Sequence, residues 1–160
     1  MKVIVADSST LITLLDTEYF TLLFKIFDNI LISNEVYQEI TTKNQHQTII
    51  NQWLEQNKMS CQTINHDDAL YQMLIKRLDK GESESIVLAK QTALPLIIDE
   101  KKGRAIAKSL GIGIVGLVGI IVKLMDDKII SKDKAIAIIK AVEANHFRLS
   151  RTLKNLVYQW

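Results

Sequence analysis

The sequence has 160 residues, enough for one domain with a hydrophobic core. Hydrophobic residues make up 48% and charged residues 24%, and this excludes a disordered or fibrous chain. The formal net charge of +2 is far from that of a strongly basic protein, so any surface for nucleic acid must be local. No segment has the composition of a linker, and we expect a single domain over residues 1–160.

Two further features exclude other classes of protein. Cys61 is the only cysteine, so there is no intramolecular disulfide and no four-cysteine zinc site. Asp7 ends the first apolar run too early for a signal peptide. The longest apolar stretch, residues 111–122, is interrupted by glycines and is shorter than the roughly 20 residues that span a bilayer. We expect a cytoplasmic protein with no membrane segment.

In the first half of the chain, apolar runs rich in Val and Ile alternate with helical patterns. The expected elements are a strand at 3–6, a helix carrying Leu11, Leu14 and Leu15, a strand at 30–32, a helix at 34–41 capped by Ser33, and a helical stripe at 49–54. The strands do not alternate apolar with polar residues, which indicates a parallel sheet covered on both faces.

The second half continues the same alternation. The expected elements are a weak strand at 62–64, a helix capped by Asp67 and carrying Leu70, Met73 and Leu74, a helix at 82–92, a strand at 96–98, a helix at 101–110 closed by Gly111, a strand at 112–115, a helix at 132–145 and a last helix from 146 to 160. We therefore predict a three-layer α/β/α fold with a central parallel sheet of four or five strands.

Carboxylates directly follow two of the predicted strands. Asp7 follows the strand at 3–6, and Asp99, with Glu100 beside it, follows the strand at 96–98. Ligands of open α/β sheets bind at the carboxyl ends of the strands, and an acid buried there costs several kcal/mol unless it is compensated. The alternative is that each acid only caps the next helix.

Two further acids come from predicted helices. Glu39 borders the buried stripe of its helix, although an acid at such a position is often just a solvated surface residue. Glu82 and Glu84 point to opposite sides of their helix, and Glu82 shares the side of Ile86, which we expect to pack inward. An acid in a first helical turn also has a simple structural explanation, because it is stabilised by the helix dipole.

Together these acids describe a site for a hard cation, since oxygen-only ligands suit Mg²⁺ or Mn²⁺. The three histidines, His46, His66 and His146, are scattered without a zinc-binding spacing, and we expect them at the surface. Asp7, Glu39, Glu82 and Asp99, with Glu100 as an alternative or additional ligand, are the predicted metal and catalytic residues.

Four segments of the sequence resemble the PIN-domain family, in particular stand-alone prokaryotic PIN proteins related to VapC-type toxin ribonucleases. They are VADSSTLI at 5–12, ISNEVYQEI at 32–40, LDKGESESI at 78–86 and LIIDEKKGR at 96–104. Three departures from that branch are the missing proline near Asn34, Glu82 where many members have Asp, and the choice of Asp99 or Glu100 as the fourth acid.

The resemblance implies an endoribonuclease that depends on Mg²⁺ or Mn²⁺ and hydrolyses RNA phosphodiester bonds, as the toxin of a toxin–antitoxin pair. It also implies an antitoxin protein as partner and a homodimer. Ser8 and Ser9 would support the site or simply form a turn. Lys80, Lys101, Lys102 and Arg104 would bind RNA phosphates or form a solvated helix face.

Three other functions fit parts of the sequence. The first is a catalytically silent PIN-like module that binds RNA or a protein. The second is a phosphatase with a nucleophilic Asp7, but Ser9 stands where that chemistry needs a second Asp. The third is a dinucleotide-binding protein, but the glycine pattern at 111–116 begins at the end of a helix rather than between a strand and a helix.

Overall fold

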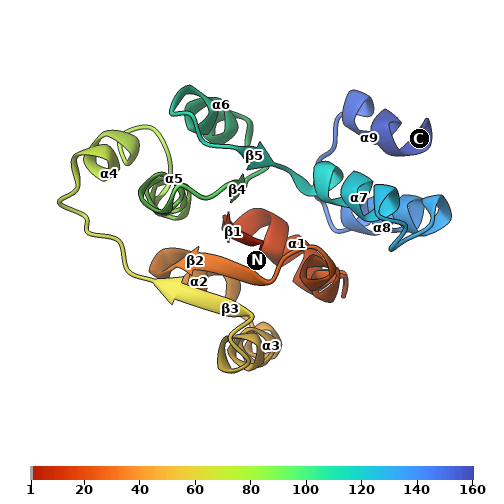
Figure 1. Cartoon of the computed structure of the whole chain (residues 1–160), viewed down its shortest axis with the longest axis horizontal. Coiled ribbons are helices and arrows are strands. Elements are labelled where there is room, and N and C mark those ends of the chain that lie inside the picture. The colour runs from red at the N-terminus through yellow and green to blue at the C-terminus, as the bar shows by residue number, and fades with distance from the viewer. Residues whose placement is uncertain (1) are drawn as a thin grey trace.

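A computed structural model describes residues 2–160 and has a central sheet of five parallel strands (Figure 1). The strands are β1 (Val3–Ala6), β2 (Asn29–Ser33), β3 (Met59–Gln62), β4 (Leu96–Ile97) and β5 (Ile114–Val115), in the spatial order β3-β2-β1-β4-β5. All four pairings are parallel, so the carboxyl ends of the strands lie at one edge of the sheet. β1 lies at the centre.

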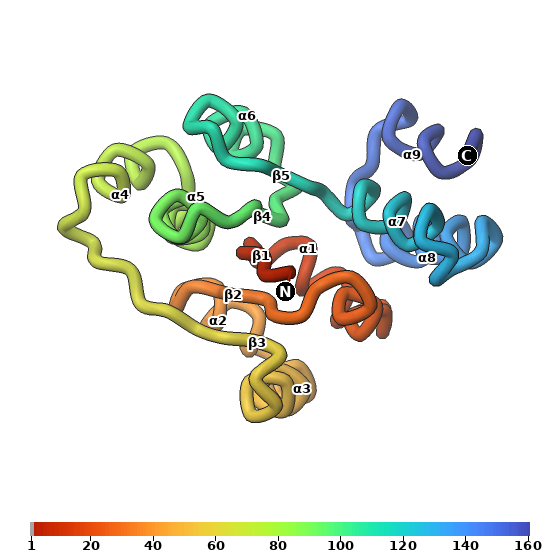
Figure 2. The backbone as a smooth tube through the Cα atoms, viewed as in Figure 1, coloured from red at the N-terminus to blue at the C-terminus, as the bar shows by residue number. Residues whose placement is uncertain are grey.

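Helices cover both faces of the sheet. They are α1 (Ser8–Asp16), the 3₁₀ helix η1 (Phe20–Lys25), α2 (Asn34–Ile40), α3 (Asn44–Glu55), α4 (Ala69–Leu74), α5 (Lys80–Thr92), α6 (Lys101–Ser109), α7 (Leu117–Asp126), α8 (Lys132–Ala144) and α9 (Arg151–Tyr158). Figure 2 shows that α7, α8 and α9 gather at one end of the molecule, with α4 at the other end. The predicted three-layer fold is confirmed.

The alternation of side chains along the strands divides the core into two parts. Ile4 and Ala6 of β1 pack into one core with α1, α2, α3, α7 and α8, whereas Val5 packs into the other with α4, α5 and α6. Successive side chains of a strand point to opposite faces, so a run without polar residues requires burial on both faces. The apolar runs of the sequence therefore fix the layers.

Four local predictions were wrong. β3 lies at Met59–Gln62 rather than 62–64, and only Met59 of this edge strand is buried. Asp68, not Asp67, caps α4, with its carboxylate accepting from Leu70 N and Tyr71 N. The last helix starts after Ser150 rather than at residue 146. We predicted no helix at α7, although its buried residues, Leu117, Val118, Ile120, Ile121, Leu124 and Met125, have a helical spacing.

No helix within residues 2–160 combines the length and the apolar character needed to cross a membrane.

Candidate active site

Asp7 lies at the junction of β1 and α1, where its backbone N donates to Ile97 O at 2.9 Å and ties the end of β1 to β4. Its side chain is only 3% exposed. Asp7 holds the N-cap position of α1, yet its carboxylate makes no capping hydrogen bond, and Oδ1 has no partner among the described residues. Helix capping therefore does not explain this buried acid.

Burial, together with the negative charges of Asp79, Asp99 and Glu100, raises the pKa of Asp7 to about 6, and a hydrogen bond from the Ser8 backbone opposes this rise. A buried carboxylate with acidic neighbours is unstable in its charged form, because neither solvent nor a cation compensates it. Such a group favours a proton or a metal ion.

Glu39 reaches this region from α2. Ser8 Oγ donates to Glu39 Oε2 at 3.3 Å, and Oε1 is buried with no hydrogen-bond partner in the part of the chain that the structure describes. Burial, together with the charges of Asp7 and Asp79, raises the pKa of Glu39 to about 7. Glu39 is half-buried, so the alternative of a solvated surface acid is wrong.

Gly81, in the first turn of α5, makes room for the Glu39 carboxylate. A Cβ atom at position 81 would lie 2.0 Å from Glu39 Oε1, far inside any allowed contact. The glycine of the sequence segment LDKGESESI thus has a steric role, which is to let α2 place an acid against α5.

Glu82 is half-buried in the first turn of α5. Burial, together with the charges of Asp79 and Asp7, raises its pKa to about 8. The expectation that only the Glu82 side of this helix packs inward was wrong, because α5 is buried on most of its circumference and Glu84 is only 3% exposed. Glu82 lies close enough to Asp7 for their charges to interact, whereas Glu84 accepts a hydrogen bond from the backbone amide of Glu35 in the first turn of α2.

Asp79 was not among the predicted metal and catalytic residues. It caps α5 by accepting from Glu82 N at 2.8 Å through Oδ1. Its charge also raises the pKa of Asp7, Glu39 and Glu82. Its position three residues before Glu82 could have drawn attention to it, but from the sequence alone an Asp at a helix start is explained as an N-cap.

Asp99 is held by two hydrogen-bond donors at the end of β4. Thr10 Oγ1 donates to Oδ2, and the Leu117 amide at the start of α7 lies 3.1 Å from both carboxylate oxygens. Burial raises the pKa of Asp99, and the bonds from Thr10 and Leu117 and the charge of Arg104 oppose this rise. A Cβ at Gly116 would lie 2.6 Å from Asp99 Oδ1, so this acid is tightly enclosed.

Glu100 is exposed and caps α6, with Oε2 accepting from Gly103 N at 2.7 Å. The capping alternative therefore applies to Glu100. The same carboxylate faces the other acids, because a Cβ at Gly103 would lie 3.5 Å from Glu100 Oε2 and 3.6 Å from Glu82 Oε2. Asp99 and Glu100 thus border the site from two sides.

These acids form one group at the carboxyl edge of the sheet, which we call the carboxylate cluster. Its members are Asp7, Glu39, Asp79, Glu82, Asp99 and Glu100. Within residues 2–160, no three His, Cys, Asp or Glu side chains have the arrangement of a ready-made metal site. The donor set still fits a hard divalent cation, since all ligands are oxygens and Asp7 Oδ1 and Glu39 Oε1 are buried without a partner.

The predicted supporting residues divide into two groups. Ser8 is buried and contacts Glu39, while Ser9 is exposed. Lys80, Lys101 and Lys102 are exposed near the cluster in sequence, and Arg104 is half-buried with Nη1 donating to Ile98 O at 2.7 Å. Thr10, the donor to Asp99, was missed because its partner is 89 residues away.

The histidines do not join the cluster. His66 and His146 are exposed, as expected. His46 is buried at 3% exposure with Nε2 3.2 Å from Asp16 Oδ1, so its predicted surface position was wrong.

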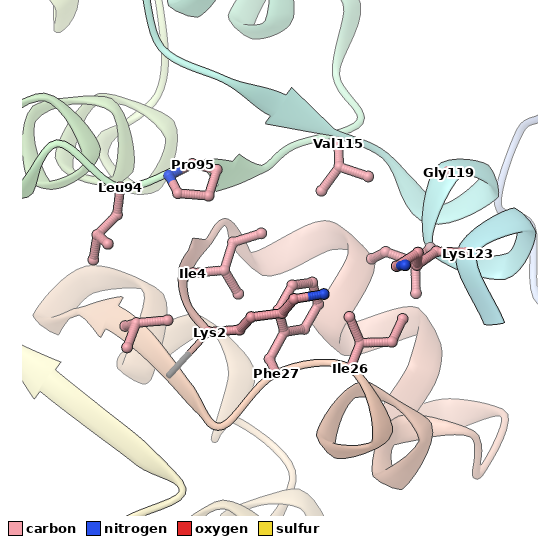
Figure 3. A pocket seen from close by; sticks show the side chains of 11 residues that line it. Lys2, Ile4, Ile26, Phe27, Leu94, Pro95, Val115, Gly119 and Lys123 are labelled. Atoms are coloured by element: carbon pink, nitrogen blue, oxygen red, sulfur yellow. The ribbon is translucent and has the colours of Figure 1, made fainter. Parts of the chain in front are cut away.

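A large apolar cavity of about 540 Å³ lies at the amino-terminal edge of β1 and β4, away from the carboxylate cluster. Figure 3 shows Ile4, Phe27, Pro95 and Val115 around it, with Lys2 and Lys123 beside them. The cavity contains no acid, and nothing in the described residues links it to the cluster.

Comparison with known proteins agrees with the fold. A family model described as DUF3368, a PIN domain, matches residues 3–159. The structure is similar to a PilT N-terminus domain protein from the hyperthermophilic archaeon Sulfolobus solfataricus P2, with 18% identity, a TM-score of 0.54, and coverage of 74% of this chain and 89% of that chain. No curated protein matches the sequence.

A chain with a five-stranded parallel sheet and acids at its carboxyl edge has the architecture of a PIN-like α/β protein. The chain belongs to the PIN-domain family, whose members are typically metal-dependent nucleases.

Proposed function

We propose that this protein is an endoribonuclease that depends on Mg²⁺ or Mn²⁺ and hydrolyses RNA phosphodiester bonds as one domain. The observation that carries the proposal is a pair of buried oxygens, Asp7 Oδ1 and Glu39 Oε1, that have no partner among residues 2–160 and lie inside a group of six acids. Burying such acids costs free energy that a bound divalent cation would offset. Membership of the PIN-domain family, whose members are typically metal-dependent nucleases, supports a nuclease function for this site.

Asp7, Glu39, Glu82 and Asp99 would hold one or two ions, and Glu100 is a further candidate ligand. A bound ion would lower the pKa of a water molecule and stabilise the charge that develops on the phosphate. Ser8 holds Glu39 through its hydroxyl, and Thr10 holds Asp99, so that two acids keep defined orientations.

The residues of the cluster also take part in proton binding. With pKa values of about 7 and 8, Glu39 is partly and Glu82 mostly protonated near neutral pH, and Asp7, at about 6, is protonated below it; an arriving cation would displace these protons. We therefore propose that metal affinity rises steeply with pH in this range.

The basic side chains complete the proposed RNA site. Lys80, Lys101 and Lys102 are exposed beside elements that carry the acids, and we propose that they bind RNA phosphates. Arg104 has a different position, since its bond to Ile98 O places the guanidinium beside Asp99. We propose that Arg104 acts chiefly by holding the end of β4 and contacts RNA only at its edge.

We further propose that the protein is a cytoplasmic toxin held by an antitoxin protein and that it forms a homodimer. Family membership supports the first part. Leu156 and Trp160, which are 54% and 53% exposed near the end of the chain, offer an apolar surface for a second copy.

A direct experiment separates this function from a catalytically silent module. The purified protein is incubated with single-stranded RNA and Mn²⁺ or Mg²⁺, with EDTA as the control. We expect cleavage that needs the metal and leaves a 5′-phosphate. Binding of RNA without cleavage across many substrates would instead identify the silent module.

A further inference from the structure

A second polar site lies beside the carboxylate cluster, between α2, α5 and the segment that follows β3. It is a cavity of about 390 Å³, within the size range of small-ligand sites. The polar side chains that line it include six from these elements: Asn34, Glu35, Gln38, Asn65, His66 and Glu84. We call it the amide pocket, because three of these six side chains are amides.

Glu84 gives the amide pocket a rigid wall. Its carboxylate is only 3% exposed, yet both oxygens have partners: Oε1 accepts from Glu35 N at 3.1 Å, and Oε2 lies 2.7 Å from His66 Nε2. The His66 ring also stacks on Tyr71, with centroids 4.2 Å apart and planes 5° from parallel. The imidazole is thus held on an edge and on one face, while its side chain stays 49% exposed.

The amide pocket and the carboxylate cluster share the same two helices. Where α2 crosses α5, Glu39 lies against Gly81, and one helical turn away Glu35 N bonds to Glu84. The charge of Glu35 also raises the pKa of Glu39. A strand of RNA with a phosphate at the cluster therefore has a neighbouring nucleotide within reach of the amide pocket.

The side chains that line the amide pocket favour the base of a nucleotide over its phosphate. Two acids, Glu35 and Glu84, line the pocket, which disfavours a phosphate. A flat base suits it, since single-stranded RNA is read by stacking on aromatic rings and by hydrogen bonds to base edges. Asn and Gln amides pair with adenine, and a Glu carboxylate accepts from the amino group of cytosine.

Building on the proposed nuclease function, we propose that the amide pocket binds one unpaired nucleobase next to the cleaved phosphate and prefers adenine or cytosine over uracil. The base stacks on the exposed face of His66. Gln38, exposed on α2, and Glu35 read the exocyclic amino group and the adjacent ring nitrogen.

The first test measures cleavage rates on RNAs that differ only in the base at one position beside the cut. The native protein should cleave the A or C substrate roughly tenfold faster than the U substrate at one such position. Gln38→Ala should reduce the A rate towards the U rate. Gln47→Ala, which alters an exposed glutamine of α3 outside the pocket, should keep the native preference. Metal-dependent cleavage with equal rates for all bases, or an unchanged preference in Gln38→Ala, overturns the pocket while the nuclease function stands.

The second test does not require activity. Cys61, the single cysteine, is exposed with Sγ 3.5 Å from Oδ1 of Asn34 in the pocket wall. In an Asp7→Asn protein, a short A-containing RNA should slow alkylation of Cys61 by iodoacetamide several-fold, and the matching U-containing RNA should slow it less. Equal protection by both RNAs, or none, contradicts the base preference even if no RNA is ever cleaved.

Discussion

Two buried acids of this protein, Asp7 and Glu84, have opposite surroundings. Asp7 and Glu84 are each 3% exposed. Glu84 has a backbone amide and an imidazole as partners, whereas Asp7 has an oxygen without a partner and three acids that raise its pKa. Burial alone therefore does not distinguish a structural acid from a functional one.

The difference lies in whether the fold compensates the charge. A buried carboxylate with two good hydrogen bonds can stabilise the native state, whereas an uncompensated one lowers its stability. An uncompensated buried carboxylate in a folded protein therefore indicates a function, and strongly perturbed pKa values tend to mark functional sites. Four substitutions and conditions test this contrast.

The largest effect should come from Asp7→Asn. Loss of a charged ligand should reduce metal-dependent RNA cleavage by on the order of 10³-fold, while the thermal midpoint stays equal or rises because an uncompensated charge is removed. Initial rates with Mn²⁺ and a thermal melt measure the two effects. Glu84→Gln is the matched control and should retain far more activity. Native rates in Asp7→Asn would remove this acid from the mechanism.

Gly81→Ala should have the next largest effect. The added Cβ would lie 2.0 Å from Glu39 Oε1 and push this carboxylate out of place, and a displacement of about 1 Å can cost roughly 100-fold in rate. Gly113→Ala is a suitable control, because its nearest neighbour, Pro95 Cβ, is at an ordinary 3.7 Å. We expect a 10- to 100-fold loss of rate for the first variant only. Equal cleavage rates in the two variants would show that the position of the Glu39 carboxylate does not matter for activity.

Glu84→Ala should affect stability more than chemistry. It leaves the part-buried Glu35 amide without its acceptor and releases His66, which we expect to cost about 1–3 kcal/mol of unfolding free energy. Urea unfolding monitored by circular dichroism gives this value. The comparison of Asp7 with Glu84 fails if this variant is as stable as the native protein.

The smallest effect concerns pH and metal. The folded-state pKa values of Asp7, Glu39 and Glu82 are raised to about 6, 7 and 8, so the native state binds more protons than the unfolded chain above about pH 4. These groups therefore make the protein less stable as pH rises from about 4 to about 8, and a bound cation should offset the loss.

Thermal melts with and without millimolar Mg²⁺ measure this behaviour. The gain from Mg²⁺ should be roughly 2–4 °C for each kcal/mol of linkage and larger at about pH 8 than at about pH 5. Asp7→Asn should reduce the gain. An equal gain at both values of pH would contradict the proton displacement.

The sequence predicted the layers well but the details of the site only in part. Both faces of a parallel sheet are apolar, so Val3–Ala6 and the later runs could be recognised locally. The edge strand β3 has only one buried residue, so it has no apolar run that could be recognised, and its predicted position was wrong. The helix α7 was not predicted, although its buried residues have a helical spacing.

Within the site, the acids that follow strands could be found because such positions are conspicuous in an apolar context. Thr10, Asp79 and the fit of Gly81 against Glu39 could not be found, since each depends on a contact between distant segments. The orientation of α5 was also beyond local patterns, because nearly all its sides are buried.

The missing side chain at position 81 gives a criterion for reading other sequences. Because Glu39 fills the volume that a methyl group would occupy, the acid on α2 and the glycine on α5 work as one unit. A PIN chain that keeps every carboxylate but carries a larger residue at the corresponding place has lost the space for its second acid. We expect such a chain to be inactive, even though its sequence contains all the acids of the site.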